Sequence, residues 1–232
     1  MSNFLLEIGT EELPADFARL AISQIEDIVD SDLKENRLRH KGIYCSSTPR
    51  RISLFIRDLP SFSEDFIEER KGPPFLKAFE NDRPTDAAIG FAKRCGIPVT
   101  DLKQRDTPKG SFVFGKIVEK GEKTSDLLVR LVPLWINRFQ GRRFMRWGVG
   151  HMRFSRPIRW LVSLLDDKEI KIKLSQIDPE LLSGRISQGH RLYFRDVSIS
   201  SADEYFEIMR DSGVIVNRDE RFNLIKGLVE KA

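Results

Sequence analysis

The residues whose type and spacing suggest a chemical role in this sequence are arginines. Eight arginines lie between residues 127 and 165, where the sequence has no aspartate or glutamate, although the 232-residue chain has a formal net charge of only +4. A guanidinium group matches phosphate oxygens with a planar fork of donors and also stacks on nucleobases. Phe144, Trp147, Phe154 and Trp160 are interleaved with these arginines, as in surfaces that bind single-stranded or terminal RNA. The segment therefore predicts a surface for an anionic partner.

Six arginines of this segment are the candidate residues for binding RNA: Arg142, Arg143, Arg146, Arg153, Arg156 and Arg159. The spacing R-x-x-R-W occurs at 143–147 and at 156–160. In a helix the two arginines of each motif would share one face, whereas in a strand they would point to opposite faces. Three alternatives stay open. The arginines could cover a solvated face or pair with acids of the same chain, the tryptophans could be core residues, and a carboxylate-rich protein could be the partner.

The sequence predicts neither a catalytic site nor a metal site. GVGHMR at 148–153 lacks the third glycine of a phosphate loop, and the motifs G-x-S-x-G, H-E-x-x-H and C-x-x-C do not occur. His40, His151 and His190 stand far apart, and Cys45 and Cys95 are interpreted as reduced thiols. We therefore expect that this chain has no catalytic residue and binds no metal or cofactor.

The N-terminal sequence and the lengths of the apolar runs indicate the cellular compartment. An acidic residue occurs by position 7 without a basic lead-in, which argues against a signal peptide. No apolar run approaches the roughly 18 residues that cross a bilayer. We expect a cytoplasmic protein that does not contact a membrane.

Apolar periodicity predicts the elements that must position the arginines. Alternating or continuous apolar residues predict strands at 4–8, in a hairpin at 42–60, and at 111–118, 158–165 and 170–174. Three- and four-residue spacing predicts helices at 14–33, 85–95, 127–139, 201–213 and 217–232. Thr85, Ser201 and Asn217 are the expected N-caps, and Pro133 should bend its helix. KGPP at 71–74 is expected to form a rigid turn.

These elements predict the α+β class, with a mixed or antiparallel sheet and packed helices. Residues 1–216 would form the α+β region, in which a break near 60–120 would separate two subdomains. The helix at 217–232 has no stop signal after its last apolar residue. We expect it to lead into a downstream domain that this chain lacks.

Seven blocks carry a resemblance to a known family: LLEIGTEELPA (5–15), STPRRISLFI (47–56), ERKGPP (69–74), PTDAAIGFAKRCGI (84–97), FMRWG (144–148), RFSRPIRWLVSL (153–164) and GHRLYF (189–194). In order and spacing they resemble the N-terminal portion of the beta subunit of bacterial glycyl-tRNA synthetase, from Phe4 to about Asn223. The stretch LYFRD after GHR departs from the family pattern, so the resemblance assigns no function to Tyr193 or Phe194.

The resemblance implies a class II aminoacyl-tRNA synthetase of α2β2 composition that joins glycine to tRNA(Gly). ATP and Mg²⁺ would be used by the catalytic alpha subunit. This chain would be a non-catalytic portion of the beta subunit that supports recognition of tRNA(Gly) and assembly with the alpha subunit. The resemblance also implies a fold similar to the sheet-and-helix domain of the phenylalanyl-tRNA synthetase beta subunit.

Two rival functions stay open at this point. The chain could be a docking module for the alpha subunit or for other beta-subunit domains with little RNA contact, because interleaved tryptophan and arginine also suit a protein interface. It could be a hydrolytic proofreading domain by analogy of fold, although the sequence offers no nucleophile or base for that role.

Overall fold

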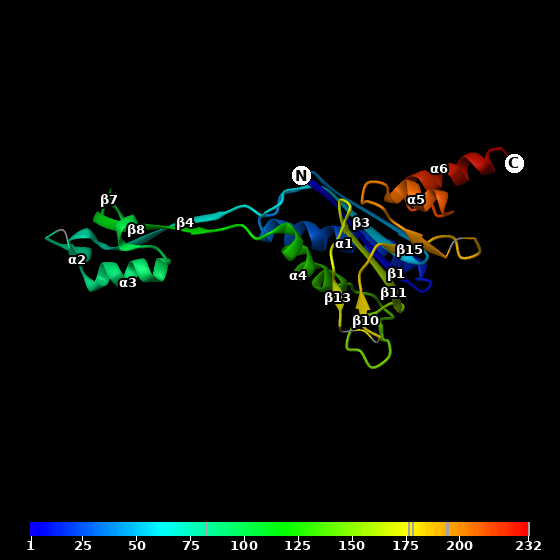
Figure 1. Ribbon diagram of the computed structural model, residues 1–232, viewed down its shortest axis with the longest axis horizontal. Coiled ribbons are helices and arrows are strands. Elements are labelled where there is room, and N and C mark those ends of the chain that lie inside the picture. Colours follow the sequence, from blue (N-terminus) through cyan, green and yellow to red (C-terminus); the bar gives the residue numbers. More distant parts are fainter. Residues whose placement is uncertain (82, 176, 178, 194, 232) are drawn as a thin grey trace. The chain divides into compact units, whose positions relative to one another are not determined.

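The computed structural model describes residues 1–81, 83–175, 177, 179–193 and 195–231. The chain forms two compact units, the first from Met1–Ser63 with Glu122–Ala232 and the second from Glu64–Gly121. The described residues contain antiparallel sheets and six α-helices, so the predicted α+β class is confirmed (Figure 1). Phe194, the last residue of the GHRLYF block, lies outside the described residues.

The first unit is built on a five-stranded sheet whose neighbouring strands are all antiparallel. Its strand order is β12-β11-β1-β3-β2. The strands are β1 (Ser2–Thr10), β2 (Gly42–Thr48), β3 (Arg51–Leu59), β11 (Ile158–Leu165) and β12 (Lys168–Glu169). The predicted hairpin at 42–60 is confirmed as β2 and β3, and the central strand β1 is the predicted strand at 4–8.

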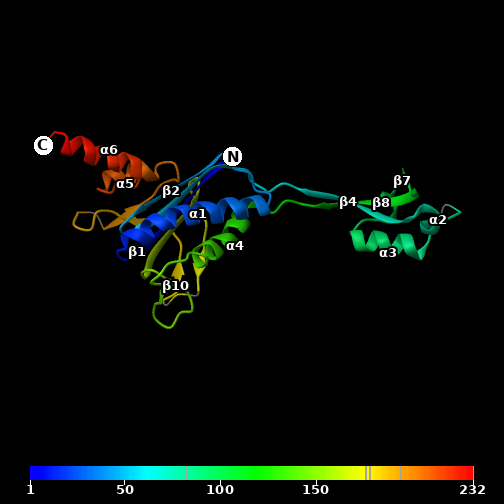
Figure 2. The ribbon, with the colours of Figure 1, turned by 180° about the vertical axis from the view of Figure 1, so that it is seen from behind.

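Both faces of this sheet are buried, which explains why the apolar run in β1 is continuous. Phe4, Leu6 and Ile8 pack with helices α1 (Ala15–Glu35) and α4 (Thr124–Asn137), which lie side by side over one face (Figure 2). Leu5 packs on the opposite face with residues around helix α5 (Tyr205–Asp211). Because strand side chains alternate between faces, Glu7 lies on the same face as Leu5.

Short strands and the last helix complete the first unit. The strands are β9 (Met145–Arg146), β10 (Arg153–Phe154), β13 (Lys173–Leu174), β14 (Leu181–Leu182), β15 (Ile186–Gln188) and β16 (Asp196–Ser198). Each pairs antiparallel with one other: β9 with β10, β13 with β14, and β15 with β16. Helix α6 spans Arg218–Val229, and its N-cap Asn217 accepts bonds from the N–H groups of Asp219 and Glu220, as predicted.

The second unit is a three-stranded antiparallel sheet, in the order β4-β8-β7, packed against a helix. Its elements are β4 (Phe66–Pro74), α2 (Phe75–Ala78), β5 (Phe79–Glu80), β6 (Arg83–Pro84), α3 (Asp86–Cys95), η1 (Val99–Asp101), β7 (Lys103–Thr107) and β8 (Gly110–Glu119). The predicted helix at 85–95 and the predicted strand at 111–118 are α3 and β8. Gly96 ends α3 in the left-handed conformation that glycine favours.

The predicted rigid turn at 71–74 is wrong, because KGPP forms the last residues of β4. This strand is at the edge of its sheet, where a proline without an N–H can be accommodated. The Gly72 backbone passes so close to α3 that an added Cβ would lie 2.6 Å from the Phe91 ring. A turn motif was therefore inferred from residues that an edge strand also accepts.

Three smaller expectations need correction. The segment 170–174 buries alternate residues as predicted, but only Lys173–Leu174 is a strand, because the Ser183 hydroxyl bonds the Ile172 N–H and the Ile170 carbonyl. Thr85 precedes α3, but its hydroxyl donates to the Lys77 and Ala78 carbonyls and does not cap the helix. Ser201 and Glu204 bond each other, but α5 begins only at Tyr205.

No helix among the described residues combines the length and the apolar character that crossing a bilayer requires.

The two cysteines are free, and Cys45 has a perturbed thiol. Burial raises the pKa of the Cys45 thiol to about 12. Because the thiolate is the reactive form, alkylation of Cys45 at pH 8 should be slow in the native chain and should accelerate strongly in urea. The rate can be followed by mass spectrometry of the Cys45 peptide. Equal rates in native and unfolded chain would contradict this prediction.

Candidate nucleic-acid interface

Within the acid-free segment, residues 141–154 follow helix α4 and form a two-stranded ribbon with exposed arginine side chains. Its strands β9 and β10 pair antiparallel, with Arg146 directly opposite Arg153 and Met145 opposite Phe154. Residues opposite each other in such a pair project from the same face, so two guanidinium groups share one face of this ribbon. Two like charges so placed repel each other unless an anion lies between them. The arrangement therefore suits binding of an anionic group.

Aromatic rings anchor this ribbon to the core. Phe17 of α1 makes edge contacts with Phe139, Phe144 and Phe154, with ring centroids 5.1–6.1 Å apart. The chain at Gly141 packs so tightly that an added Cβ would lie 2.4 Å from the Phe144 ring. The aromatic residues of this segment therefore pack the ribbon against the core.

The prediction that these aromatic residues offer a stacking surface is wrong for Phe154 and Trp160, which are buried. Trp147 is partly buried and donates its Nε1–H to the Phe154 carbonyl at 3.1 Å. Trp135 is fully buried and donates to Asp32 at 2.9 Å. The alternative interpretation of the tryptophans as core residues describes Trp135 and Trp160.

The six candidate arginines are all exposed, but they fall into two groups. The first group lies on the ribbon: Arg142, Arg143, Arg146 and Arg153. Arg153 donates to the Phe144 carbonyl at 3.0 Å. Within the described part of the chain, no carboxylate pairs with any arginine of this group. The guanidinium charges of the ribbon are therefore open to an external anion.

The second group, Arg156 and Arg159, lies against the segment that follows β1. Arg156 donates to the Glu12 carbonyl at 3.0 Å, and Arg159 forms an ion pair of 2.7 Å with Glu11. The Glu11 carboxylate neutralises part of this charge. Neither R-x-x-R-W motif lies in a helix, so the one-turn spacing of paired arginines does not occur.

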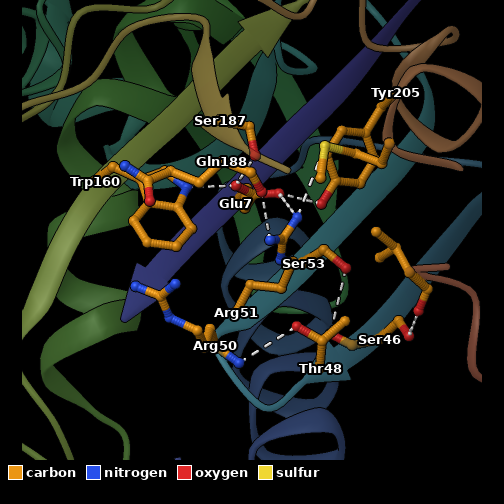
Figure 3. Close-up of polar contacts among 12 residues, drawn as sticks. Glu7, Ser46, Thr48, Arg50, Arg51, Ser53, Trp160, Ser187, Gln188 and Tyr205 are labelled. Atoms are coloured by element: carbon orange, nitrogen blue, oxygen red, sulfur yellow. Dashed lines mark hydrogen bonds and ion pairs between the residues drawn. The ribbon is translucent and has the colours of Figure 1, made fainter. Parts of the chain in front are cut away.

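A buried polar cluster, which the sequence interpretation missed, lies on the α5 face of the main sheet. Glu7 is fully buried and accepts hydrogen bonds from Trp160 Nε1 at 2.5 Å and from the hydroxyls of Ser187 and Tyr205. Arg51 is the counter-ion, with its Nη1 3.5 Å from Glu7 Oε2. Figure 3 shows these side chains converging on the carboxylate from four elements. A lone acid inside the apolar run of β1 was the signal that could have identified it.

This cluster connects β1 to the neighbouring segments of the first unit. Arg51 also donates to the Gln188 carbonyl at 2.6 Å, which joins β3 to β15. Burial beside Glu7 raises the pKa of the Tyr205 phenol well above its usual value, so Tyr205 remains a hydrogen-bond donor. A carboxylate with four partners is satisfied by the chain itself, and we interpret Glu7 as structural. Among the described residues, no three metal-binding side chains come together.

The fold and the ribbon define an α+β protein with an exposed basic surface. Comparison with known proteins shows the family to which it belongs. Residues 4–232 match the family described as glycyl-tRNA synthetase beta subunit. The chain is 43% identical over 227 residues to the glycine–tRNA ligase beta subunit of Synechocystis sp., covering 97% of this chain and 31% of that protein. The corresponding protein of Halothermothrix orenii is 36% identical, covering 96% of this chain and 32% of that protein. This chain therefore belongs to the glycyl-tRNA synthetase beta subunit family. It spans about a third of the length of the curated relatives it matches.

Proposed function

We propose that this chain is a non-catalytic portion of a glycine–tRNA ligase that supports recognition of tRNA(Gly). Family membership over nearly the whole chain supports this role. ATP and Mg²⁺ would be used by a catalytic alpha subunit, and the assembly would be a cytoplasmic α2β2 complex. The likeness of the fold to the phenylalanyl-tRNA synthetase beta subunit remains a prediction.

The observation that carries RNA contact is the opposed pair Arg146 and Arg153 on the exposed ribbon. A backbone phosphate lying between them would relieve their repulsion and form charge-assisted hydrogen bonds with both. Arg142 and Arg143 lie in the loop that precedes β9 and are also exposed. Such contacts position RNA without reading its sequence, because phosphates are alike at every nucleotide. Arg156 and Arg159 would contribute less, since Arg159 already has a carboxylate partner.

Replacing Arg146 and Arg153 by alanine should weaken tRNA binding and flatten its salt dependence. Each lost phosphate contact should reduce the magnitude of the negative slope of log K against log salt concentration by about 1. The measurement is a fluorescence titration of labelled tRNA at several salt concentrations. The matched control is Arg57→Ala, an exposed arginine of β3 in the same unit. If the ribbon double variant and the control have the same slope, the ribbon does not bind RNA.

A second candidate function, docking of a partner subunit, is supported by helix α6. Its apolar side chains Phe222, Ile225, Leu228 and Val229 are exposed. An exposed apolar helix face is a common feature of protein interfaces. Copurification with the alpha subunit of glycyl-tRNA synthetase, without salt-dependent tRNA binding, would favour docking over RNA contact.

A further inference from the structure

A basic cavity of about 300 Å³ lies in the first unit, separate from the ribbon. Five basic residues and one acid line it: Arg50, Arg51, His190, Arg191, Arg221 and Glu12. They come from the segment after β1, from the end of the β2–β3 turn and the start of β3, from the segment between β15 and β16, and from α6. Such a volume is at the lower end of small-ligand sites. The cavity therefore suits a single small group.

The positive charge of this cavity is only partly neutralised by the chain. Arg51 is paired with the buried Glu7, and Arg191 forms an exposed pair with Glu12 at 3.2 Å. Among the described residues, Arg221 donates to the carbonyls of Ile215, Val216 and Ser47 and pairs with no carboxylate. Within the described part of the chain, Arg50 has no carboxylate partner. Two guanidinium charges are thus left for an anion.

Arg51 and Arg221 add two observations on the electrostatics of this cavity. The Nε of Arg51 is buried and has no hydrogen-bond partner within the described residues, and the residue as a whole is only 3% exposed. A buried donor without a partner costs free energy. Burial, and then the neighbouring Arg218, lower the pKa of the Arg221 guanidinium. The lowered pKa of Arg221 is expected where a guanidinium group is partly buried beside another cation.

Flat side chains lie beside these cations. The His190 ring, which lines the cavity, stacks on Tyr193 with centroids 5.1 Å apart and planes 24° apart. Tyr193 is 77% exposed, so its second face is open to solvent. The Arg50 guanidinium lies 5.8 Å from the Trp160 ring centroid (Figure 3). This contact restrains the guanidinium group at the wall of the cavity. A phosphate beside an open aromatic face is the arrangement that a nucleotide requires.

We propose that this cavity binds the phosphate group of a nucleotide, whose base lies on the exposed face of Tyr193. The guanidinium groups of Arg50 and Arg221 hold the phosphate oxygens. A nucleotide within single-stranded RNA and a free mononucleotide share this chemistry. The inference does not depend on the six arginines of the acid-free segment, because none of them lines the cavity.

The test is calorimetric titration of the chain with three probes: inorganic phosphate, adenosine monophosphate and a short single-stranded oligoribonucleotide. Arg50→Gln should weaken binding of all three by about tenfold, the value expected for losing a charge-assisted bond. Arg57→Gln, which removes an exposed arginine from the same hairpin, is the matched control and should have no effect. Tyr193→Ala should weaken the two nucleotide probes but leave inorganic phosphate unchanged.

The outcomes separate the source of the phosphate from failure of the proposal. Much tighter binding of the oligoribonucleotide than of adenosine monophosphate identifies RNA as the source, and equal affinities identify a mononucleotide. Absence of saturable binding for all three probes, or equal losses in Arg50→Gln and Arg57→Gln, overturns the proposal. The double variant of Arg146 and Arg153 should still bind adenosine monophosphate, so failure of the ribbon would not be mistaken for failure of the cavity. Unchanged thermal unfolding of Arg50→Gln excludes misfolding.

Discussion

Glu7→Ala should destabilise the first unit by about 3–5 kcal/mol, the range measured when one partner of a buried ion pair is removed. The substitution leaves Arg51 as an uncompensated buried cation, only 3% exposed. It also takes the acceptor from the donors of Trp160, Ser187 and Tyr205. Urea unfolding followed by tryptophan fluorescence would measure the change, because Trp160 reports on this cluster.

Two further variants test this explanation. Glu220→Ala removes the partly exposed partner of the exposed Arg210 and should cost less than about 1 kcal/mol, because solvent screens that pair. Glu7→Gln keeps a carbonyl acceptor and should cost less than Glu7→Ala, although Arg51 still loses its counter-ion. If Glu7→Ala costs no more than Glu220→Ala, Glu7 does not hold the loops around β1 in place.

Most strands of the main sheet could be predicted, although not their order, because apolar periodicity is local. β1, β3 and β11 have apolar runs, and α1 repeats apolar residues on one helical face. These patterns survive in the structure because burial of those faces dominates the energetics. KGPP at 71–74 was predicted wrongly because proline and glycine report only local backbone preference. Whether they form a turn or an edge strand depends on β8, which is more than 30 residues away.

The candidate site could be predicted by residue type but not by arrangement. The acid-free composition identified the arginines, and the pairing of Arg146 with Arg153 follows from a tight chain reversal. Placement of Arg159 against Glu11 brings together residues separated by 148 positions, which no local pattern encodes. The same limit applies to the basic cavity, whose arginines come from separate parts of the chain. The buried ion pair of Arg51 with Glu7 was missed because Glu7 appeared as one polar residue in an apolar strand.

Gly9→Ala should destabilise the first unit by about 3 kcal/mol, at the upper end for overpacked cores. Gly9 is paired with Trp160 across β1 and β11, and the indole lies over the glycine. A Cβ at position 9 would lie 1.9 Å from two carbon atoms of that indole. Trp160 cannot easily move away, because its Nε1–H is bonded to Glu7. Urea unfolding would again measure the loss.

Gly42→Ala is the matched control for Gly9→Ala, since Gly42 begins a strand of the same sheet and has no atom within 4 Å of an added Cβ. It should change stability by less than about 0.5 kcal/mol. A displaced indole would also move the Arg50 guanidinium that rests against it. Gly9→Ala should therefore weaken binding of adenosine monophosphate, whereas Gly42→Ala should not. If Gly9→Ala is as stable as Gly42→Ala, the hydrogen bond to Glu7 does not hold the Trp160 indole in place.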